Sequence, residues 1–323
     1  MNGGRNAGPE QGPNETLERR RRWPNLFIVG AVKAGTTSLY RYLDDHPDIY
    51  MSPVKEPDFF THEGADPDAY LGLFEGASGE KLLGEATPWY LARPGTAERI
   101  RNVSPDAKIL IMLRDPVSRA YSQYLMDVRN GRQTAELWEA VQKDHRLPEH
   151  GYVSLGSYCE QVSRYLEVFG DQVLVAFFED FVRDPRGSLE RVLHFLGVDP
   201  GRARNIDLGV HNSYRRLRGV WGRPAWNAYR NKRIRSVAQR LFPPRVRERA
   251  HGFIFSGKKP PMDPRAHRFL QHVYRDEAAC LRRLLGRGVP WGNGLIRSER
   301  SGSAKMVWAE EPNAPSKDDR GGL

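Results

Sequence analysis

The stretch from residue 25 to residue 43, NLFIVGAVKAGTTSLYRYL, constrains the fold of this chain most strongly. It begins with an apolar, partly β-branched run at 26–29, which predicts a short buried strand. A turn bounded by Gly30 and Gly35 follows, and leucines then recur at helical spacing. A strand, a glycine-bounded loop and a helix in this order form a phosphate cradle, because backbone N–H groups and the helix N-terminus converge on an anion.

The spacing of Gly30 and Gly35 is that of the loop that binds nucleoside triphosphates, but the residues after it differ. That motif continues with lysine and then serine or threonine, whereas this loop carries its only lysine, Lys33, inside and continues with hydroxyls at 36–38. The pattern predicts a phosphate-bearing ligand other than ATP with magnesium. The alternative is a tight turn in which glycine serves only the backbone angles.

Apolar runs alternate with helical patterns along the rest of the chain. The continuous runs at 107–113 and 172–178 are typical of strands covered on both faces, and 81–88 reads as a strand that runs into a loop. This alternation predicts an α/β fold with a three-layer, P-loop-like parallel sheet flanked by helices in a single domain. The expected helices are 68–74, 117–126, 158–169, 185–196 and 264–285.

Composition divides the chain into a domain, two tails and one basic segment. Residues 1–22 and 298–323 read as disordered, which leaves 23–297 as the domain. The formal net charge is +10, and residues 215–249 hold eleven arginines and one lysine against a single glutamate. We interpret 212–250 as basic helices with an apolar stripe, which predicts an anionic partner, with a solvated basic face as the alternative.

The cysteines, the histidines and the hydropathy exclude several classes of protein. Cys159 and Cys280 are too few for a disulfide framework, and the nine histidines show no metal-ligand spacing. No run approaches the roughly 18 apolar residues of a membrane span. The basic residues near the N-terminus are not followed by the apolar core of a secretory signal. We therefore expect a protein of the reducing cytoplasm that binds no metal.

A second cluster of phosphate-binding groups is predicted at the end of another strand, where open α/β sheets bind ligands. Arg114 ends the strand at 107–113, and Ser122 lies two turns into the following helix. The forked donors of arginine and a serine hydroxyl suit a second phosphate. The alternative is an ion pair between Arg114 and Asp115 with the serine facing solvent.

A candidate general base and a basic loop complete the set. Glu56 stands in the run KEPDFF, and aromatic neighbours can remove water from a carboxylate, as a base acting near neutral pH requires. Glu56 could equally form a structural ion pair with Lys55 or Lys33. His62 is kept as a spare base, and the loop 257–259, GKK, could close over an anionic ligand or be solvated surface.

Together these motifs resemble sulfotransferases that use 3′-phosphoadenosine 5′-phosphosulfate (PAPS), in the branch similar to heparan sulfate sulfotransferases and their bacterial relatives. The segment FIVGAVKAGTTSL is similar to that family's 5′-phosphosulfate loop. The segment IMLRDPVSRAYSQY, about eighty residues later, is similar to its 3′-phosphate site. The resemblance extends from Asn25 to Trp291 and is weakest near 212–251.

The resemblance implies a role for each matching residue. Lys33 would contact the bridging oxygen and stabilise the departing 5′-phosphate, while Glu56 would deprotonate the acceptor. Arg114 and Ser122 would hold the 3′-phosphate. The mechanism would need positioning and electrostatics but no divalent metal. The remaining nucleotide contacts implied by the resemblance are Ala34, Gly35, Thr36, Thr37, Ser38, Tyr158, Gly257, Lys258 and Lys259.

Two departures from the animal relatives leave the acceptor open. Ala86 stands where they carry a lysine beside the acceptor, and the cysteine pair before their terminal loop is missing around 253–256. The expected acceptor is a hydroxyl, less favourably an amine, of a small molecule, glycan or glycolipid. The alternatives are a P-loop kinase, or a protein whose segment 215–249 binds an anionic polymer or a membrane. We favour a role of this segment in docking an anionic or amphipathic acceptor, with peripheral membrane contact and without nucleic acid.

Overall fold

A computed structural model describes residues 22–62, 64–146, 151–203, 206–208, 216–217, 255–256 and 259–291. Several sequence predictions lie outside these residues. They are the two disordered tails, almost all of the basic segment 212–250, Gly257 and Lys258. These predictions stay untested by the structure.

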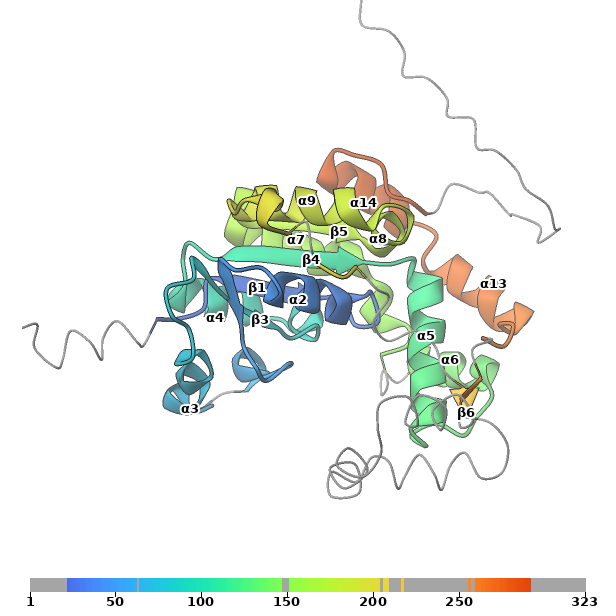
Figure 1. Cartoon of the computed structure of the whole chain (residues 1–323). Coiled ribbons are helices and arrows are strands. Elements are labelled where there is room, and N and C mark those ends of the chain that lie inside the picture. Colours follow the sequence, from blue (N-terminus) through green and yellow to red (C-terminus); the bar gives the residue numbers. More distant parts are fainter. Residues whose placement is uncertain are drawn as a thin grey trace, which may run out of the picture. The chain divides into compact units, whose positions relative to one another are not determined.

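A five-stranded parallel sheet forms the centre of the fold, with strand order β2-β3-β1-β4-β5 (Figure 1). β1 and β3 are buried at every residue, as expected of strands that have helices on both faces. The predicted parallel α/β sheet is therefore confirmed. The strands are Leu26–Gly30 (β1), Ile49–Met51 (β2), Leu82–Ala86 (β3), Lys108–Leu113 (β4) and Val173–Phe177 (β5).

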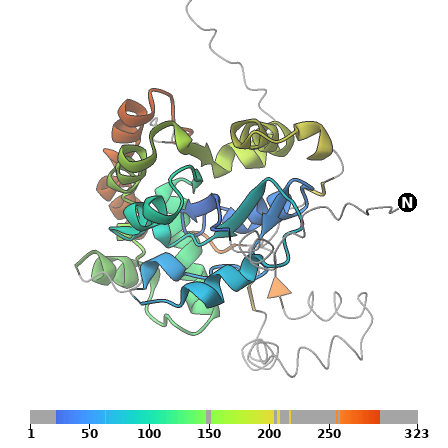
Figure 2. The same cartoon turned by 90° about the vertical axis from the view of Figure 1, so that its left-hand side faces the viewer.

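Helices cover the sheet on both faces, as Figures 1 and 2 show. α2 packs on β1, β2 and β3, while α7 and α9 pack on β5 and α4 and α14 pack on α7. The short helices α4, α6 and α8 escaped the sequence analysis. The helices at the sheet are Thr36–Asp44 (α2), Pro67–Leu71 (α3), Thr96–Val103 (α4), Tyr158–Phe169 (α7), Phe178–Arg183 (α8), Pro185–Leu196 (α9) and Glu277–Leu285 (α14).

A second, smaller core lies beyond the end of β4. There α5, Pro116–Arg129, extends away from the sheet and packs against α13, Pro264–Val273 (Figure 1). α6, Leu137–Arg146, completes this group, which has its own buried apolar cluster. The two short strands Arg216–Leu217 (β6) and Phe255–Ser256 (β7) pair with each other in antiparallel fashion.

The single terminal helix predicted at 264–285 is wrong, because the structure divides it into α13 and α14. Tyr274, between the two helices, donates its hydroxyl hydrogen to the carbonyls of Tyr152 and Val153, at 3.0 and 2.7 Å. This buried anchor fixes the chain where the two helices take different partners. α13 packs on α5 and α6, and α14 packs on α7.

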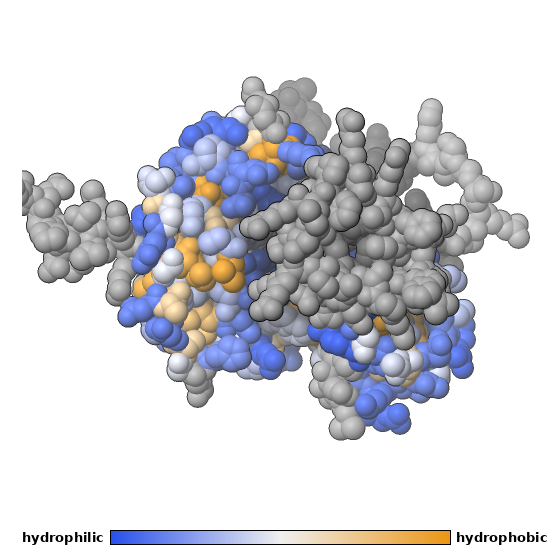
Figure 3. Space-filling model, turned by 60° about the horizontal axis from the view of Figure 1, so that its bottom comes forward, coloured by the Kyte–Doolittle hydropathy of each residue, from blue (hydrophilic) through white to orange (hydrophobic). Residues whose placement is uncertain are grey.

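The surface shown in Figure 3 carries hydrophilic residues with apolar patches between them. Among the described residues, the exposed large hydrophobic side chains are Val54, at 48%, and Val182, at 62%. None of the helices within the described ranges is both long and apolar enough to cross a membrane.

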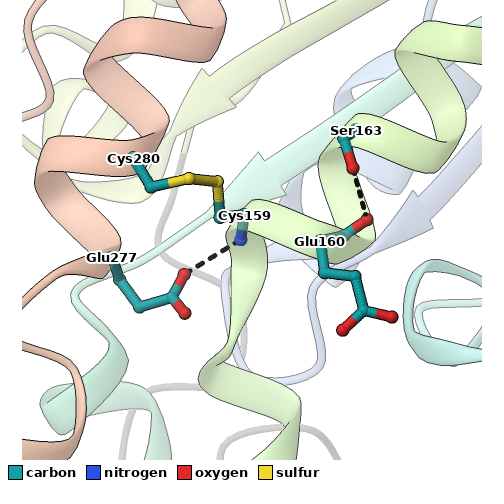
Figure 4. The surroundings of a disulfide bond; sticks show 5 residues. All are labelled: Cys159, Glu160, Ser163, Glu277 and Cys280. Carbon is teal, nitrogen blue, oxygen red and sulfur yellow. Dashed lines mark hydrogen bonds between the residues drawn. A yellow bond between two sulfur atoms is a disulfide. The ribbon is translucent and has the colours of Figure 1, made fainter.

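Cys159 of α7 and Cys280 of α14 form a disulfide, with their Cα atoms 6.0 Å apart (Figure 4). Next to it, Glu277 accepts a hydrogen bond from the backbone N–H of Cys159 at 2.9 Å. The two cysteines are too few for a framework, but they still tie α14 to α7 covalently. Cysteine usage is therefore no longer a reason to expect a reducing compartment, and the cytoplasmic location stays a prediction.

Candidate active site

The predicted phosphate cradle lies between the end of β1 and the start of α2. Gly35 precedes α2 in the left-handed region, with φ of 95°, and no side chain caps the helix. A Cβ atom at Gly35 would lie 2.8 Å from the ring of Phe178, so only glycine fits. In the first turn the N–H of Ser38 donates to the carbonyl of Gly35 at 3.0 Å, and the backbone N–H groups of Thr36 and Thr37 are suited to an anion.

Lys33 lies half-buried in this loop and reaches towards α5. Its backbone has φ of 66°, and its Nζ atom lies 3.6 Å from Sδ of Met126. Burial, followed by the positive charges of Arg129 and Arg114, lowers the pKa of Lys33 to about 8, while the negative charges of Asp127 and Glu56 act in the opposite direction. Two arginines and the candidate base therefore all act electrostatically on Lys33.

Arg114 follows β4 and lies directly beside the cradle. Its Nη1 donates to the carbonyl of Lys33 at 3.2 Å, and its guanidinium stacks over the ring of Phe178 at 4.5 Å. Burial is the main reason why its pKa is lowered. Asp115 accepts a hydrogen bond from Ser118 N at 2.9 Å and so caps α5. The carboxylate of Asp115 thus serves the helix, and Arg114 points to the cradle.

Three further residues that the resemblance implied lie near Arg114. Tyr158 is fully buried and donates to the carbonyl of Arg114 at 2.9 Å, so it supports that residue from the protein side. Ser122 is half-buried on α5, one turn before Met126 and hence on the helix face that meets Lys33. The third residue, Lys259, comes from the terminal loop.

Lys259 brings a cation from far along the chain to the same place. Its Nζ lies over the ring of Tyr121 at 4.4 Å. Partial burial of its ammonium group lowers the pKa of Lys259 to about 8, and the charge of Arg114 contributes to this. The part of the predicted 257–259 loop that the structure describes therefore lies near the predicted 3′-phosphate site.

Burial is the main reason for the lowered pKa of Lys33 and Lys259, and the positive charge of Arg114 contributes to both, because like charges held together repel. A doubly phosphorylated nucleotide would relieve that repulsion and would also satisfy the uncapped helix start. The residues therefore fit the phosphates of PAPS. In the described ranges, no group of three or more His, Cys, Asp or Glu side chains is arranged to hold a metal ion.

Glu56 lies on a loop of unusual backbone conformation. Glu56 and Asp58 have φ of 62° and 57°, in the region that residues other than glycine rarely adopt. The carboxylate of Glu56 is 44% exposed, and its Oε1 lies 2.5 Å from Nζ of Lys55. Phe60 is buried and Phe59 stacks on Tyr70 at 4.3 Å. The expected desolvation of Glu56 is wrong, because its aromatic neighbours turn into the core.

His62, the spare base, lies 3.3 Å from Asp58 through its Nε2 and is 70% exposed. It therefore forms a surface pair with a residue of the same loop. Ala86 is fully buried at the end of β3.

Glu85 is the residue that the sequence analysis overlooked. It is fully buried in β3, and its Oε1 accepts hydrogen bonds from Tyr70 at 2.7 Å and from Tyr90 at 3.0 Å. Thr87 donates to Oε2 at 2.7 Å. Burial raises the pKa of Glu85 to about 7. A charged residue within the apolar run LLGEA was the signal that could have revealed it.

The comparisons with known proteins agree with this geometry. The sulfotransferase domain family matches residues 24–279, so the chain belongs to that family. A solved sulfotransferase from Alicyclobacillus acidocaldarius is 34% identical, with a TM-score of 0.61, and the match covers 83% of this chain and 97% of that one. The resemblance to PAPS-dependent sulfotransferases is confirmed.

Two curated relatives match over shorter stretches. Mouse heparan sulfate glucosamine 3-O-sulfotransferase 6 is 32% identical over 185 residues, which are 55% of this chain and 54% of that protein. The membrane-associated sulfotransferase kil1 of Dictyostelium discoideum is 39% identical over 110 residues, 33% of this chain and 23% of that protein. The chain thus matches about half, or less, of the length of these relatives.

Proposed function

We propose that this protein transfers a sulfuryl group from PAPS to a hydroxyl group of an acceptor. The observation that carries the proposal is the placement of Arg114 beside Lys33 at the uncapped start of α2, with Nη1 of Arg114 3.2 Å from the carbonyl of Lys33. Two neighbouring cations and the uncapped start of a helix suit two phosphates of one nucleotide. A triphosphate site would need a lysine after the loop, and that position holds Thr36.

In this reaction the acceptor oxygen attacks sulfur while the bond from sulfur to the 5′-phosphate oxygen breaks. The acceptor proton passes to Glu56, and adenosine 3′,5′-bisphosphate leaves. Negative charge grows on the leaving phosphate, where Lys33 and the cradle N–H groups lie. The pKa of Lys33, about 8, keeps this side chain mainly protonated at neutral pH.

The base is proposed to be Glu56 because its carboxylate is open to an arriving acceptor and close to Lys33. It is 44% exposed, and its charge acts on Lys33. Its Oε1 contacts Nζ of Lys55 at 2.5 Å, and its second oxygen, Oε2, can accept the proton of the acceptor hydroxyl. Proton transfer to a positioned carboxylate contributes about 10² to 10⁴ in rate.

The acceptor is proposed to be a small molecule, glycan or glycolipid with both polar and apolar parts. Val54, two residues before Glu56, is 48% exposed and offers apolar contact at the acceptor side. Ala86 provides no cation for an acidic polysaccharide. The proposal that segment 212–250 helps to dock the acceptor depends on residues that the structure does not describe.

The direct test has a binding arm and a transfer arm. Calorimetry with adenosine 3′,5′-bisphosphate should show metal-independent binding, weakened in Lys33→Ala and Arg114→Ala. Transfer from sulfur-labelled PAPS is then measured on heparan sulfate fragments, glycolipids, phenols and alkyl amines. A protein that is folded but binds no adenosine bisphosphate would contradict the proposal.

Lys81, at the amino ends of the parallel strands, provides a matched control for Lys33. Lys81 lies just before β3, is 64% exposed and pairs with Asp48 at 3.5 Å. Lys81→Ala removes one positive charge, as Lys33→Ala does, but far from the cradle along the strand direction. Binding should be unchanged in Lys81→Ala, so equal losses in both variants would mean that only net charge matters.

A further inference from the structure

The loop that carries Glu56 is tied to the end of β3 at every second amide. The base loop, residues 52–61, donates the backbone N–H groups of residues 56, 58 and 60 to the segment 86–90. The acceptors are, in this order, the carbonyl of Ala86 at 3.1 Å, Oγ1 of Thr87 at 3.3 Å and the hydroxyl of Tyr90 at 3.2 Å.

Two of these three acceptors are side-chain hydroxyls whose direction is set by Glu85. A hydroxyl has one hydrogen, so it can accept from a backbone amide while it donates elsewhere. Thr87 donates to Oε2 of Glu85 at 2.7 Å and Tyr90 donates to Oε1 at 3.0 Å. Each hydroxyl therefore turns its lone pairs to the base loop.

The base loop needs such restraint because of its backbone. Glu56 and Asp58 both have positive φ, which is unfavourable for residues with a side chain unless the surroundings hold them. The amides bound by Ala86 and Thr87 belong to these same two residues. The hydrogen bonds therefore act at the positions where the loop would otherwise relax.

We propose that Glu85 is a positioning residue for the reaction, which holds the base Glu56 in place through the hydroxyls of Thr87 and Tyr90. The inference rests on the proposed role of Glu56 as the base. Glu85 is fully buried and lies behind the loop, so it acts without touching the acceptor. A carboxylate is suited to this task, since it accepts from several hydroxyls and donates to none.

Tyr70 offers a matched control within the same network. Its hydroxyl also donates to Oε1 of Glu85, at 2.7 Å, but the backbone amides at 56, 58 and 60 go to other acceptors. Its ring stacks on Phe59 at 4.3 Å, and a phenylalanine would preserve that contact. Tyr70→Phe and Tyr90→Phe thus remove one Glu85 hydrogen bond each, and only Tyr90→Phe frees a loop amide.

The experiment compares Thr87→Val, Thr87→Ser, Tyr90→Phe and Tyr70→Phe in the full chain. Three quantities are measured for each variant. They are the hydrogen-exchange rates of the loop amides, the Kd of adenosine 3′,5′-bisphosphate by calorimetry, and kcat with an acceptor that the unchanged protein sulfates in the transfer assay. Thr87→Val should speed exchange of the Asp58 amide at least about tenfold and lower kcat by about tenfold, with the bisphosphate Kd within about twofold. Tyr90→Phe should speed exchange of the Phe60 amide and lower kcat by similar factors, again without changing the bisphosphate Kd.

The controls separate positioning from general stability. Thr87→Ser keeps the hydroxyl and should restore both exchange protection and kcat, while Tyr70→Phe should leave both within about twofold of the unchanged protein. Equal effects of Tyr70→Phe and Tyr90→Phe, or unchanged loop exchange in Thr87→Val, would overturn the inference.

The role of the base itself is checked separately with Glu56→Gln. If Glu56→Gln abolishes transfer while Thr87→Val changes neither exchange nor kcat, the positioning role fails and the proposed function stands. If Glu56→Gln keeps full activity, the assignment of the base fails, and the positioning role fails with it. Hydrogen exchange of the loop amides can be measured without an acceptor. It therefore tests the positioning role even when no compound of the panel is sulfated.

Discussion

The two sides of the candidate site are built in different ways. The donor side, residues 30–38 with Arg114, consists of groups placed directly at strand ends. Burial, followed by the charges of Arg129 and Arg114, lowers the pKa of the half-buried Lys33 there. The base side, loop 52–61, presents Glu56 at 44% exposure from a backbone with positive φ. The donor side relies on charged groups. The base loop instead donates its backbone amides to the hydroxyls of Thr87 and Tyr90, which in turn donate to the buried carboxylate of Glu85.

This difference shows that phosphate binding and proton transfer place different demands on the fold. A phosphate needs fixed donors, and a strand end followed by a helix supplies them with few residues. A base needs access to a changing partner, so it stands on a loop, and the loop then needs a support of its own. We propose that Glu85, through the hydroxyls of Thr87 and Tyr90, is that support.

Glu56→Gln should affect catalysis without affecting the donor side. Loss of the proton acceptor should lower kcat on the order of 10³-fold, while the Kd of adenosine 3′,5′-bisphosphate stays within about twofold. Steady-state transfer assays and calorimetry on the same preparation measure the two quantities. A large loss of bisphosphate affinity would show that the two sides are not independent.

Arg114→Ala should have the converse effect. Arg114 stacks on Phe178 and donates to the carbonyl of Lys33, so its loss removes charged donors from the donor side. The bisphosphate Kd should rise about 10- to 100-fold, as expected for charged hydrogen bonds worth about 1.5–3 kcal/mol. Adenosine 5′-phosphate, which lacks the 3′-phosphate, serves as the control ligand. It should bind the variant and the unchanged protein with similar affinity.

Bisphosphate binding should weaken as the pH rises above about 8. Burial lowers the pKa of Lys33 and of Lys259 to about 8, so both lose their charge there in the free protein. Since phosphate favours the protonated lysines, affinity is fully present below this pKa and falls above it, by about tenfold per lysine between pH 7.5 and 9.5. Calorimetry across this range measures the slope, and Lys259→Ala should make it shallower. A bisphosphate affinity that does not change between about pH 7.5 and 9.5 would contradict the proposed contact of both lysines with phosphate.

Breaking the disulfide should affect stability more than binding. Cys159 follows Tyr158, which supports Arg114 from behind, but the bridge itself lies between α7 and α14. The double variant Cys159→Ser, Cys280→Ser should lose about 2–4 kcal/mol of unfolding free energy, with the bisphosphate Kd changed at most about threefold. Denaturant unfolding with and without reductant measures this. Unchanged stability together with two free thiols in the native protein would show that the bridge does not form.

Local patterns explain which parts of the fold and the site were predictable. Apolar runs such as 26–29 and 107–113 report burial on both faces, so the parallel sheet followed from them. The short helices α4 and α6 have mixed compositions and were missed. Glu56 was located by its motif, but its exposure depends on where Phe59 and Phe60 turn, and no pattern within the loop encodes that direction.

The amino-acid sequence was sufficient to predict the family, the candidate phosphate cradle around Lys33, and Arg114 as the candidate for a second phosphate. These depend on short motifs whose backbone geometry is set by neighbours in the chain. Only the tertiary structure showed that the amides of Asp58 and Phe60 donate to Thr87 and Tyr90. It also showed that Cys159 and Cys280 meet and that Lys259 lies over the ring of Tyr121. Those pairs come from distant or separately folded segments, and only packing of the sheet and its helices brings them into contact.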